Sequence, residues 1–227
     1  DITHGIEKFN VFEGAFILYV ISDYIPEDSV VVGVIDPTVG TQRDAIIVKT
    51  RFHYFVGPDN GLFSLVTEKE GIEKIVKIEN PKFLLKKRGM FDGRDVFSPI
   101  AASLAMGVKM EEFGKVKNEI EKLDFPKPTI EENSIKVKVL YIDGFGNIVT
   151  NIKNEEFFSW YEHGKSLLLT TTNSNLMVGI STSYEESNTE VFFVEGSTGF
   201  LEISGKRKSA SDYLKVKVGE EILIQKT

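Results

Sequence analysis

The chain has 227 residues and a formal net charge of −7, and its longest run of basic residues is Lys86–Arg88. This balance argues against a nucleic-acid partner. The absence of cysteine excludes disulfides, thiolate metal sites and a cysteine nucleophile, and with three histidines we expect no metal site. No apolar stretch is long enough to span a membrane and no signal peptide is visible, so we expect a cytoplasmic protein.

The first half of the chain alternates helical and strand patterns. Apolar residues recur at helical spacing over 12–21, and Asn10 is placed to cap that helix. The β-branched run Val30–Ile35 predicts a strand buried on both faces, as in the middle of a parallel sheet. A helix over 96–106 is expected to be capped by Asp95. The remaining expected elements are strands over 45–48, 53–56 and 74–78 and a helix over 62–70. This order predicts an α/β domain over residues 1–124, with a mostly parallel sheet and flanking helices.

The pattern changes after residue 124. Residues 125–134 contain two prolines and no periodicity, and we interpret them as a linker. Short strand-like runs with glycine-bearing turns then predict an all-β, barrel-like domain over residues 135–227. The runs are 137–141, 167–170, 176–180, 191–194, 200–203 and 222–225.

Three polar loops follow apolar strands of the first domain: Asp36–Arg43, Pro58–Gly61 and Phe91–Asp95. If the sheet is parallel, these loops meet at one edge, where open α/β sheets bind their ligands. Two further candidate loops, Tyr141–Asn151 and Gly196–Phe200, lie in the second domain. Each loop taken alone is also ordinary turn chemistry, and a surface Asp–Arg pair would contribute little.

Seven segments, taken in their order along the chain, point to one family. On these segments the chain resembles the S-adenosylmethionine (SAM) hydrolases, also called SAM hydroxide adenosyltransferases, which are related to the SAM-dependent fluorinase and chlorinase. The resemblance covers nearly the whole chain. The segments are DITHGI (1–6), FNVFEGAFIL (9–18), VIDPTVGTQR (34–43), FVGPDNGLFS (55–64), FDGRDVFSPIAA (91–102), DGFGNIVTNI (143–152) and GSTGFLEI (196–203).

The resemblance implies an α/β domain joined to a β-barrel in a homotrimer. It places each ligand site between the N-terminal domain of one subunit and the C-terminal domain of its neighbour. It also implies SAM as the substrate, adenosine as a product and no cofactor. The family has a first strand whose loop supplies an Asp to the ribose. That strand would precede Asp1, and we expect the N-terminal domain of this chain to lack it.

The family holds the attacking water with an Asp, an Arg and a His. By motif, the Asp corresponds to Asp36 and the Arg to Arg43, whereas the position of the His is Asp92 in this chain. The halogenases carry an aromatic residue at the position of Asp36 and Ser at that of Gly93, so both residues here disfavour halide chemistry. Two carboxylates beside one water, Asp36 and Asp92, repel each other. In one interpretation, one of the two acts as a general base, and in another, the site fails to stabilise hydroxide. In a third interpretation, Asp92 only caps the turn that follows it.

Further positions match ligand-binding residues of the family. Asp143 and Asn147 match residues that bind the amino-acid end or the adenine of the ligand. Ser197 and Thr198 match positions that hold the methionine carboxylate. The candidate ligand-binding set also contains Asn60, Phe91, Gly93 and Phe145. None of the three histidines has a visible partner in the sequence, and we assign none of them to catalysis.

The chemistry implied is attack of water on the ribose 5′ carbon of SAM, which releases adenosine and methionine. Methionine leaves from a sulfonium without needing a proton, so the difficulty lies in activating the water. Arg43 stays charged and favours hydroxide, while Asp36 orients the water. The alternatives are a non-catalytic SAM- or adenosine-binding trimer that has lost activity through Asp92 and, less favoured, a SAM-dependent halogenase.

Overall fold

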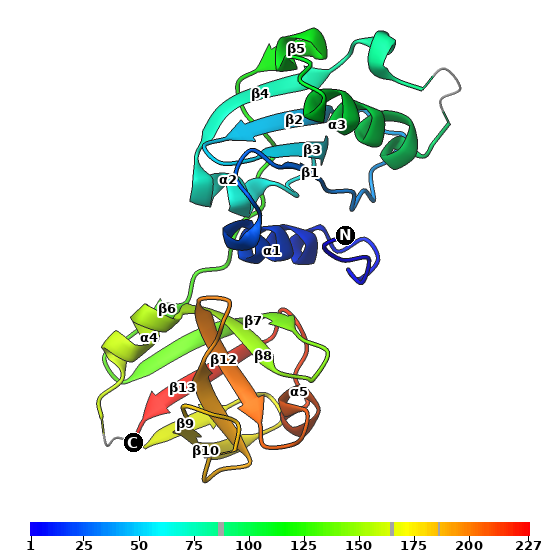
Figure 1. Ribbon diagram of the computed structural model, residues 1–227. Coiled ribbons are helices and arrows are strands. Elements are labelled where there is room, and N and C mark those ends of the chain that lie inside the picture. Colours follow the sequence, from blue (N-terminus) through cyan, green and yellow to red (C-terminus); the bar gives the residue numbers. More distant parts are fainter. Residues whose placement is uncertain (86–88, 164–165, 186) are drawn as a thin grey trace. The chain divides into compact units, whose positions relative to one another are not determined.

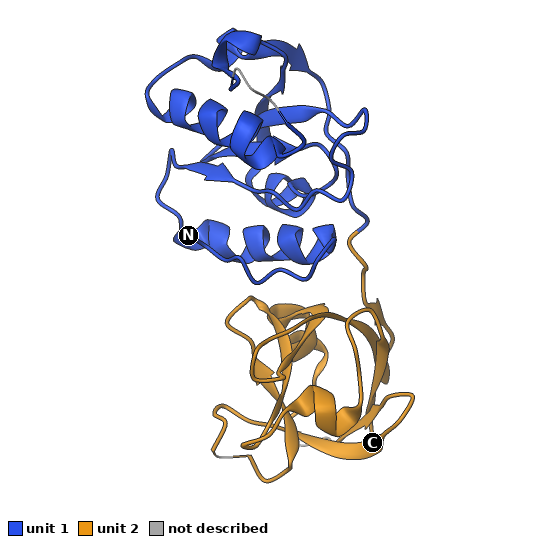
Figure 2. Ribbon diagram, turned by 90° about the vertical axis from the view of Figure 1, so that its right-hand side faces the viewer, with its two compact units in different colours: residues 1–124 blue, residues 125–227 orange. Residues whose placement is uncertain are grey.

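The computed structural model describes residues 1–85, 89–163, 166–185 and 187–227. The chain divides into two compact units, residues 1–124 (unit 1) and residues 125–227 (unit 2), drawn in different colours in Figure 2. The basic run Lys86–Arg88 lies outside the described residues. Across the described ranges, no helix has the length and apolar character needed to cross a membrane.

Unit 1 is built on a five-stranded mixed sheet in the order β1-β3-β2-β4-β5. Among these strands β1 and β3 run parallel, and the other three pairs are antiparallel. The prediction of a mostly parallel sheet is therefore wrong. Three residues separate β2 from β3, and so short a connection allows only a hairpin, because a parallel pair needs a crossover of about a dozen residues. The strands are β1 (Val30–Val32), β2 (Ala45–Thr50), β3 (Tyr54–Pro58), β4 (Ile72–Ile78) and β5 (Gly114–Lys117).

Strand β1 lies at an edge of this sheet. Val31 is buried, but Val32 is 41% exposed, so the prediction of a central strand buried on both faces is wrong. A β-branched run indicates an extended backbone, and it does not say what covers each face of the strand.

Helices cover both faces of the sheet in unit 1 (Figure 1). On one face, α1 (Val11–Ile21) and α2 (Ser64–Glu70) pack with Val48 and Phe55. On the other face, α3 (Ser98–Ala105) packs through Ile100 against Ile47 and Val56. The predicted cap is confirmed, since Asn10 Oδ1 accepts the Glu13 N–H at 3.0 Å. The short helical turns are η1 (Ser22–Tyr24), η2 (Pro81–Phe83), the π-helical turn η3 (Gly93–Phe97) and η4 (Met110–Glu112).

Asp95 does not cap α3, contrary to the prediction. It lies inside η3, and α3 begins three residues later at Ser98. Its side chain is fully buried, pairs with Arg94 Nε at 2.6 Å and accepts the Gly89 N–H at 2.6 Å. Asp95 therefore fixes the conformation of the loop that carries Asp92.

Unit 2 is a closed seven-stranded barrel, which confirms the predicted all-β architecture. Its order is β13-β9-β10-β11-β12-β8-β7, closed by pairing of β13 with β7, and β6 extends β7 outside the ring. The β10–β11 pair is parallel, and the remaining described pairs are antiparallel. The strands are β6 (Thr129–Ile130), β7 (Ser134–Ile142), β8 (Ile148–Lys153), β9 (Leu167–Thr170), β10 (Asn175–Ile180), β11 (Val191–Glu195), β12 (Phe200–Gly205) and β13 (Glu221–Lys226).

One apolar cluster fills the barrel, and two short helices, α4 (Asn154–Trp160) and α5 (Ala210–Leu214), contribute Phe157 and Leu214 to it. Residues 125–134, interpreted from the sequence as a linker, make contacts within unit 2. β6 pairs with β7, and the Phe125 and Phe200 ring centroids are 5.9 Å apart. This segment is therefore part of the second unit.

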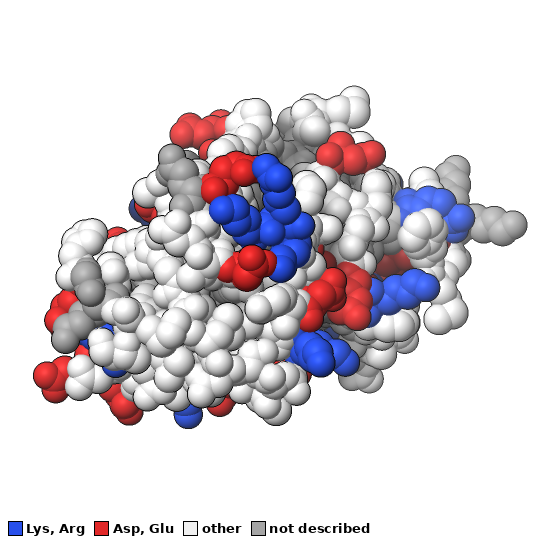
Figure 3. Space-filling model, turned by 90° about the horizontal axis from the view of Figure 1, so that it is seen from below, with Lys and Arg blue, Asp and Glu red and all other residues white. Residues whose placement is uncertain are grey.

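Charged side chains are mixed on the face shown in Figure 3. Groups of Lys and Arg lie beside groups of Asp and Glu, separated by larger uncharged areas. Such paired charges differ from the continuous basic field by which proteins attract nucleic acid.

Candidate active site

Hydrogen bonds join the three polar loops of unit 1. Asn60 Nδ2 donates to the Ile35 carbonyl at 2.9 Å, which ties the loop after β3 to the loop after β1. Arg43 Nη2 donates to Asp92 Oδ2 at 2.6 Å, which ties the loop before β2 to the loop before η3. The loops therefore meet as the sequence predicted, although the sheet is mixed.

Arg43 lies between two carboxylates. Its Nε donates to Asp36 Oδ2 at 3.0 Å, and its Nη2 contacts both Asp36 Oδ2 and Asp92 Oδ2. Thr38 Oγ1 donates to the other Asp36 oxygen at 3.1 Å. The side chains of Arg43, Asp36 and Asp92 are only 9%, 6% and 9% exposed, so water screens their charges weakly.

The surroundings of Arg43 favour its charged form. Burial disfavours the guanidinium, but hydrogen bonds to Asp36 and Asp92 and their negative charges outweigh burial and raise the pKa of Arg43 above its usual value. The guanidinium carbon lies 5.4 Å from the centroid of the Phe97 ring, which covers it. Within the described residues, Nη1 donates to no protein acceptor, which leaves one N–H edge for a water or hydroxide.

Asp92 does not act as a cap. It occupies the N-cap position of η3 without a capping hydrogen bond from its side chain, and its carboxylate pairs with Arg43 instead. The repulsion expected between Asp36 and Asp92 is offset by the Arg43 cation, which contacts both side chains. Neighbouring Phe91 is 60% exposed, and a Cβ added at Gly93 would crowd its ring.

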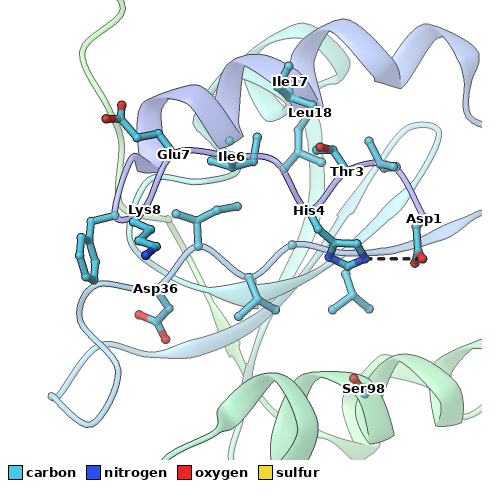
Figure 4. A pocket seen from close by; sticks show the side chains of 17 residues that line it. Asp1, Thr3, His4, Ile6, Glu7, Lys8, Ile17, Leu18, Asp36 and Ser98 are labelled. Carbon is cyan, nitrogen blue, oxygen red and sulfur yellow. Dashed lines mark ion pairs between the residues drawn. The ribbon is translucent and has the colours of Figure 1, made fainter. Parts of the chain in front are cut away.

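A cavity of about 650 Å³ opens beside Asp36. It is lined by the segment before α1, one face of α1 and the residues that follow β1. In Figure 4, Asp36 and Lys8 lie at one end and the exposed His4–Asp1 pair, 3.5 Å apart, lies at the other. The cavity combines apolar walls with a few polar groups, which is typical of small-molecule sites.

A second cavity of about 400 Å³ borders Arg43 and Asn60. Lys117 lies in its wall, 2.8 Å from Asp44 Oδ2 and 2.7 Å from the buried Asp59 Oδ2. Although burial opposes its charge, hydrogen bonds to these carboxylates raise the pKa of Lys117 above its usual value. This network is not visible in the sequence, because a lysine in a short edge strand carries no signal of two partners more than fifty residues away.

In unit 2 the turn Asp143–Asn147 is held by its own side chains. Asp143 Oδ1 accepts the N–H groups of Phe145 and Asn147, each at 2.9 Å, and Asn147 Nδ2 donates to Asp143 Oδ2 at 3.0 Å. Gly146 has φ +82°, a conformation that favours glycine. The turn projects Phe145, which is 83% exposed, as a free aromatic surface.

The structure separates this turn from Gly196–Gly199. In the β8–β12 pair, Ile148 faces Ile203 and Lys153 faces Phe200, so the two turns lie at opposite ends of the pair. Six residues of β8 place them roughly 17 Å apart. A single ligand that contacted both turns would therefore have to be extended.

Glu202 lies between the two turns and was not singled out in the sequence. It is buried, and its Oε1 accepts hydrogen bonds from Tyr184 Oη at 2.8 Å and Ser204 Oγ at 2.6 Å. Burial, followed by the hydrogen bond and charge of Glu202 and the charge of Asp143, raises the pKa of Tyr184. The residue sits in a strand-like run, where periodicity alone predicts packing rather than a polar contact.

His53 also has partners that the sequence did not reveal. Its Nδ1 lies 2.9 Å from Glu70 Oε1, its Nε2 lies 3.1 Å from the Ile25 carbonyl, and Thr50 Oγ1 donates to Glu70 Oε2 at 2.5 Å. This buried cluster lies away from the three loops. Among the described residues, no three His, Asp or Glu side chains are grouped to hold a metal ion.

Known proteins share this architecture. Residues 1–114 match the SAM hydroxide adenosyltransferase N-terminal domain, and residues 137–223 match the C-terminal domain of the same family. An (R)-S-adenosyl-L-methionine hydrolase of Methanocaldococcus jannaschii is 37% identical over 99% of this chain and 81% of its own length. One from Thermus thermophilus is 31% identical over 96% of this chain and 84% of its own length.

A solved structure agrees with these matches. A conserved protein of Thermotoga maritima superposes with a TM-score of 0.93 at 35% identity, over 99% of this chain and 88% of that one. The fold and the site thus define a two-unit protein with an α/β sheet and a closed barrel. The chain belongs to the SAM hydroxide adenosyltransferase family.

Proposed function

We propose that this chain is an enzyme that hydrolyses S-adenosyl-L-methionine to adenosine and L-methionine. The observation that carries the proposal is the Arg43 guanidinium held between Asp36 and Asp92 in weakly screened surroundings, in a chain whose two units both match one enzyme family. SAM is the substrate, and the reaction needs no cofactor.

The chemistry uses a fixed cation to make water a nucleophile. The free edge of Arg43 favours hydroxide over water, and Asp36 orients the attacking oxygen by accepting its proton in a hydrogen bond. The oxygen attacks the ribose 5′ carbon, the C–S bond breaks, and its electron pair stays on the sulfur of methionine. The proton lost by the water passes to Asp92 or to solvent.

The ligand contacts complete the proposal. Asn60, Phe91 and Gly93 adjoin the reacting centre in unit 1. Asp143, Phe145 and Asn147 bind one end of SAM, and Ser197 and Thr198 hold its carboxylate. The opposite placement of the two unit 2 turns along the β8–β12 pair supports contacts to an extended ligand. We also propose a cytoplasmic homotrimer with ligand sites between subunits. Light scattering would test the number of subunits.

A second candidate is a protein that binds SAM or adenosine without turnover. It is favoured by Asp92, because a second carboxylate on Arg43 opposes an anionic nucleophile. Asp36 and Gly93 make a halogenase the least favoured of the three.

The test is to incubate the purified full chain with SAM at several pH values and to identify the products by mass. Hydrolysis gives adenosine plus methionine, and Asp36→Ala and Arg43→Ala should each lower turnover about 10²-fold or more. Gln42→Ala is the matched control, since Gln42 is an exposed neighbour of Arg43 outside the ion-pair network. Intact SAM recovered on the protein would instead establish the binding protein, and a chloride-dependent product would establish a halogenase.

A further inference from the structure

We propose that Asn154 is a positioning residue that shapes the turn Gly196–Gly199 into a carboxylate-binding site. The inference rests on the proposed function, because the carboxylate is that of SAM. Asn154 is buried at the start of α4. Its Nδ2 donates to the Gly196 carbonyl at 2.9 Å, and its Oδ1 accepts the Gly196 N–H at 3.3 Å.

The same residue also holds the other end of the turn. The Asn154 backbone N–H donates to the Gly199 carbonyl at 3.0 Å, and the Gly199 N–H donates to the Gly196 carbonyl at 3.1 Å. A Cβ at Gly196 would collide with the Phe200 carbonyl, so the side chain of Asn154 meets bare backbone there. One residue thus fixes the conformation of Ser197 and Thr198 between these two glycines.

The turn Gly196–Gly199 carries hydrogen-bond donors that have no protein acceptor among the described residues. The backbone N–H groups of Ser197 and Thr198 donate to no acceptor among the described residues. Thr198 Oγ1 is buried and has no hydrogen-bond partner in the same part of the chain. Consecutive backbone N–H groups with adjacent hydroxyls form a concave anion site, and a carboxylate is an anion of the right size.

A cavity of about 510 Å³ adjoins this turn. Gly196 and Ser197 line it together with the hydroxyl-bearing Ser181 and Thr182, and with Glu195. An α-amino acid carries a carboxylate and an ammonium group, and the turn and Glu195 supply a partner of the correct sign for each. The cavity therefore suits the amino-acid end of the substrate better than its adenine.

Asn151 provides a matched control on the preceding strand. Its buried side chain also makes two hydrogen bonds to backbone, accepting the Lys138 N–H at 2.7 Å and donating to the Pro126 carbonyl at 2.9 Å. Both of these partners lie outside the turn Gly196–Gly199, elsewhere in unit 2. Its truncation removes a comparable amide from the same barrel.

The experiment compares SAM with decarboxylated SAM, which lacks only the carboxylate. For the wild-type chain, kcat/KM should favour SAM by about tenfold or more, the effect of a hydrogen bond to a charged group. In Asn154→Ala this preference should fall about tenfold, because KM for SAM rises. The kcat for SAM and the kcat/KM for decarboxylated SAM should change little. Asn151→Ala should keep the wild-type preference.

Several outcomes would overturn the inference. If the wild type shows no preference for SAM, the turn does not bind the carboxylate. If Asn154→Ala keeps the preference while both substrates lose activity equally, Asn154 is merely structural. If Asn154→Ala does not fold, Asn154→Ser carries the same comparison with less loss of volume. If the wild type fails to hydrolyse SAM, the proposed function is wrong. Calorimetry then tests Asn154 separately, through the ratio of the dissociation constants of SAM and decarboxylated SAM in the wild type and in Asn154→Ala.

Discussion

Arg43 Nη2 lies 2.6 Å from Asp92 Oδ2, although 49 positions separate the two residues in the chain. This contact gives Asp92 a partner that also serves Asp36. Asp92 is therefore a second carboxylate on the guanidinium to which the proposed mechanism assigns the stabilisation of hydroxide.

The first prediction concerns that charge. Asp92→His removes a carboxylate from Arg43 and should raise kcat about tenfold, which corresponds to about 1.4 kcal/mol of transition-state stabilisation. The measurement is adenosine release at saturating SAM across a pH series. Met90→His is the control, because Met90 is an exposed residue two positions away. Unchanged turnover and an unchanged pH profile in Asp92→His would remove position 92 from the mechanism.

The second prediction concerns Lys117. Lys117→Met leaves the buried Asp59 carboxylate without its cation, and we expect a loss of about 1–3 kcal/mol in the free energy of unfolding. Denaturant unfolding measures the change. Lys77→Met also removes a lysine from Asp44, but Lys77 is more exposed and does not contact Asp59, so its effect should be clearly smaller. Equal effects of the two variants would contradict the role given to Asp59.

The third prediction is a pH dependence. Burial raises the pKa of Asp44, but Lys117 and Lys77 outweigh it and hold that pKa below the ordinary value of 3.8. A carboxyl with a lowered pKa stabilises the folded state above the unfolded-state pKa, and this contribution disappears as the pH falls through the folded-state pKa. Asp44→Asn should therefore destabilise the protein at neutral pH, and the difference from wild type should shrink below pH 3.8. Thermal unfolding across the range from pH 2 to 7 provides the measurement. A difference that grows on acidification would reverse the assigned sign.

The fourth prediction concerns the His53 cluster. Glu70→Ala removes the partner of His53 Nδ1 and Thr50 Oγ1, and leaves both polar groups buried. We expect a loss of about 1–3 kcal/mol in the free energy of unfolding, because buried polar groups lose their hydrogen-bond partner. Glu68→Ala on the exposed side of the same helix should cost little. Similar midpoints for the two variants in urea would show that the cluster does not stabilise the fold.

Local patterns predicted many elements of this protein, but β5, β8, α4 and α5 were not expected. The Asn10 cap follows from a side chain that reaches only three residues along the chain, and the strand runs of unit 2 follow from alternation within each run. The antiparallel hairpin of β2 and β3 was missed, because the apolar content of a strand does not report the direction of its neighbours. The Asp95 cap was wrong because Arg94 and Gly89 compete for the same carboxylate.

By itself, the sequence determined the family, the division near residue 124 and the loops that carry Asp36, Arg43 and Asp92, since these depend on residue order and local periodicity. Only the tertiary structure decided which charges share a partner. It placed Arg43 between two carboxylates, Lys117 between Asp44 and Asp59, and Asn154 against the turn that carries Ser197 and Thr198. Hydrogen bonds and ion pairs act over a few ångströms in space, whatever the separation along the chain, so no local pattern in the sequence encodes them.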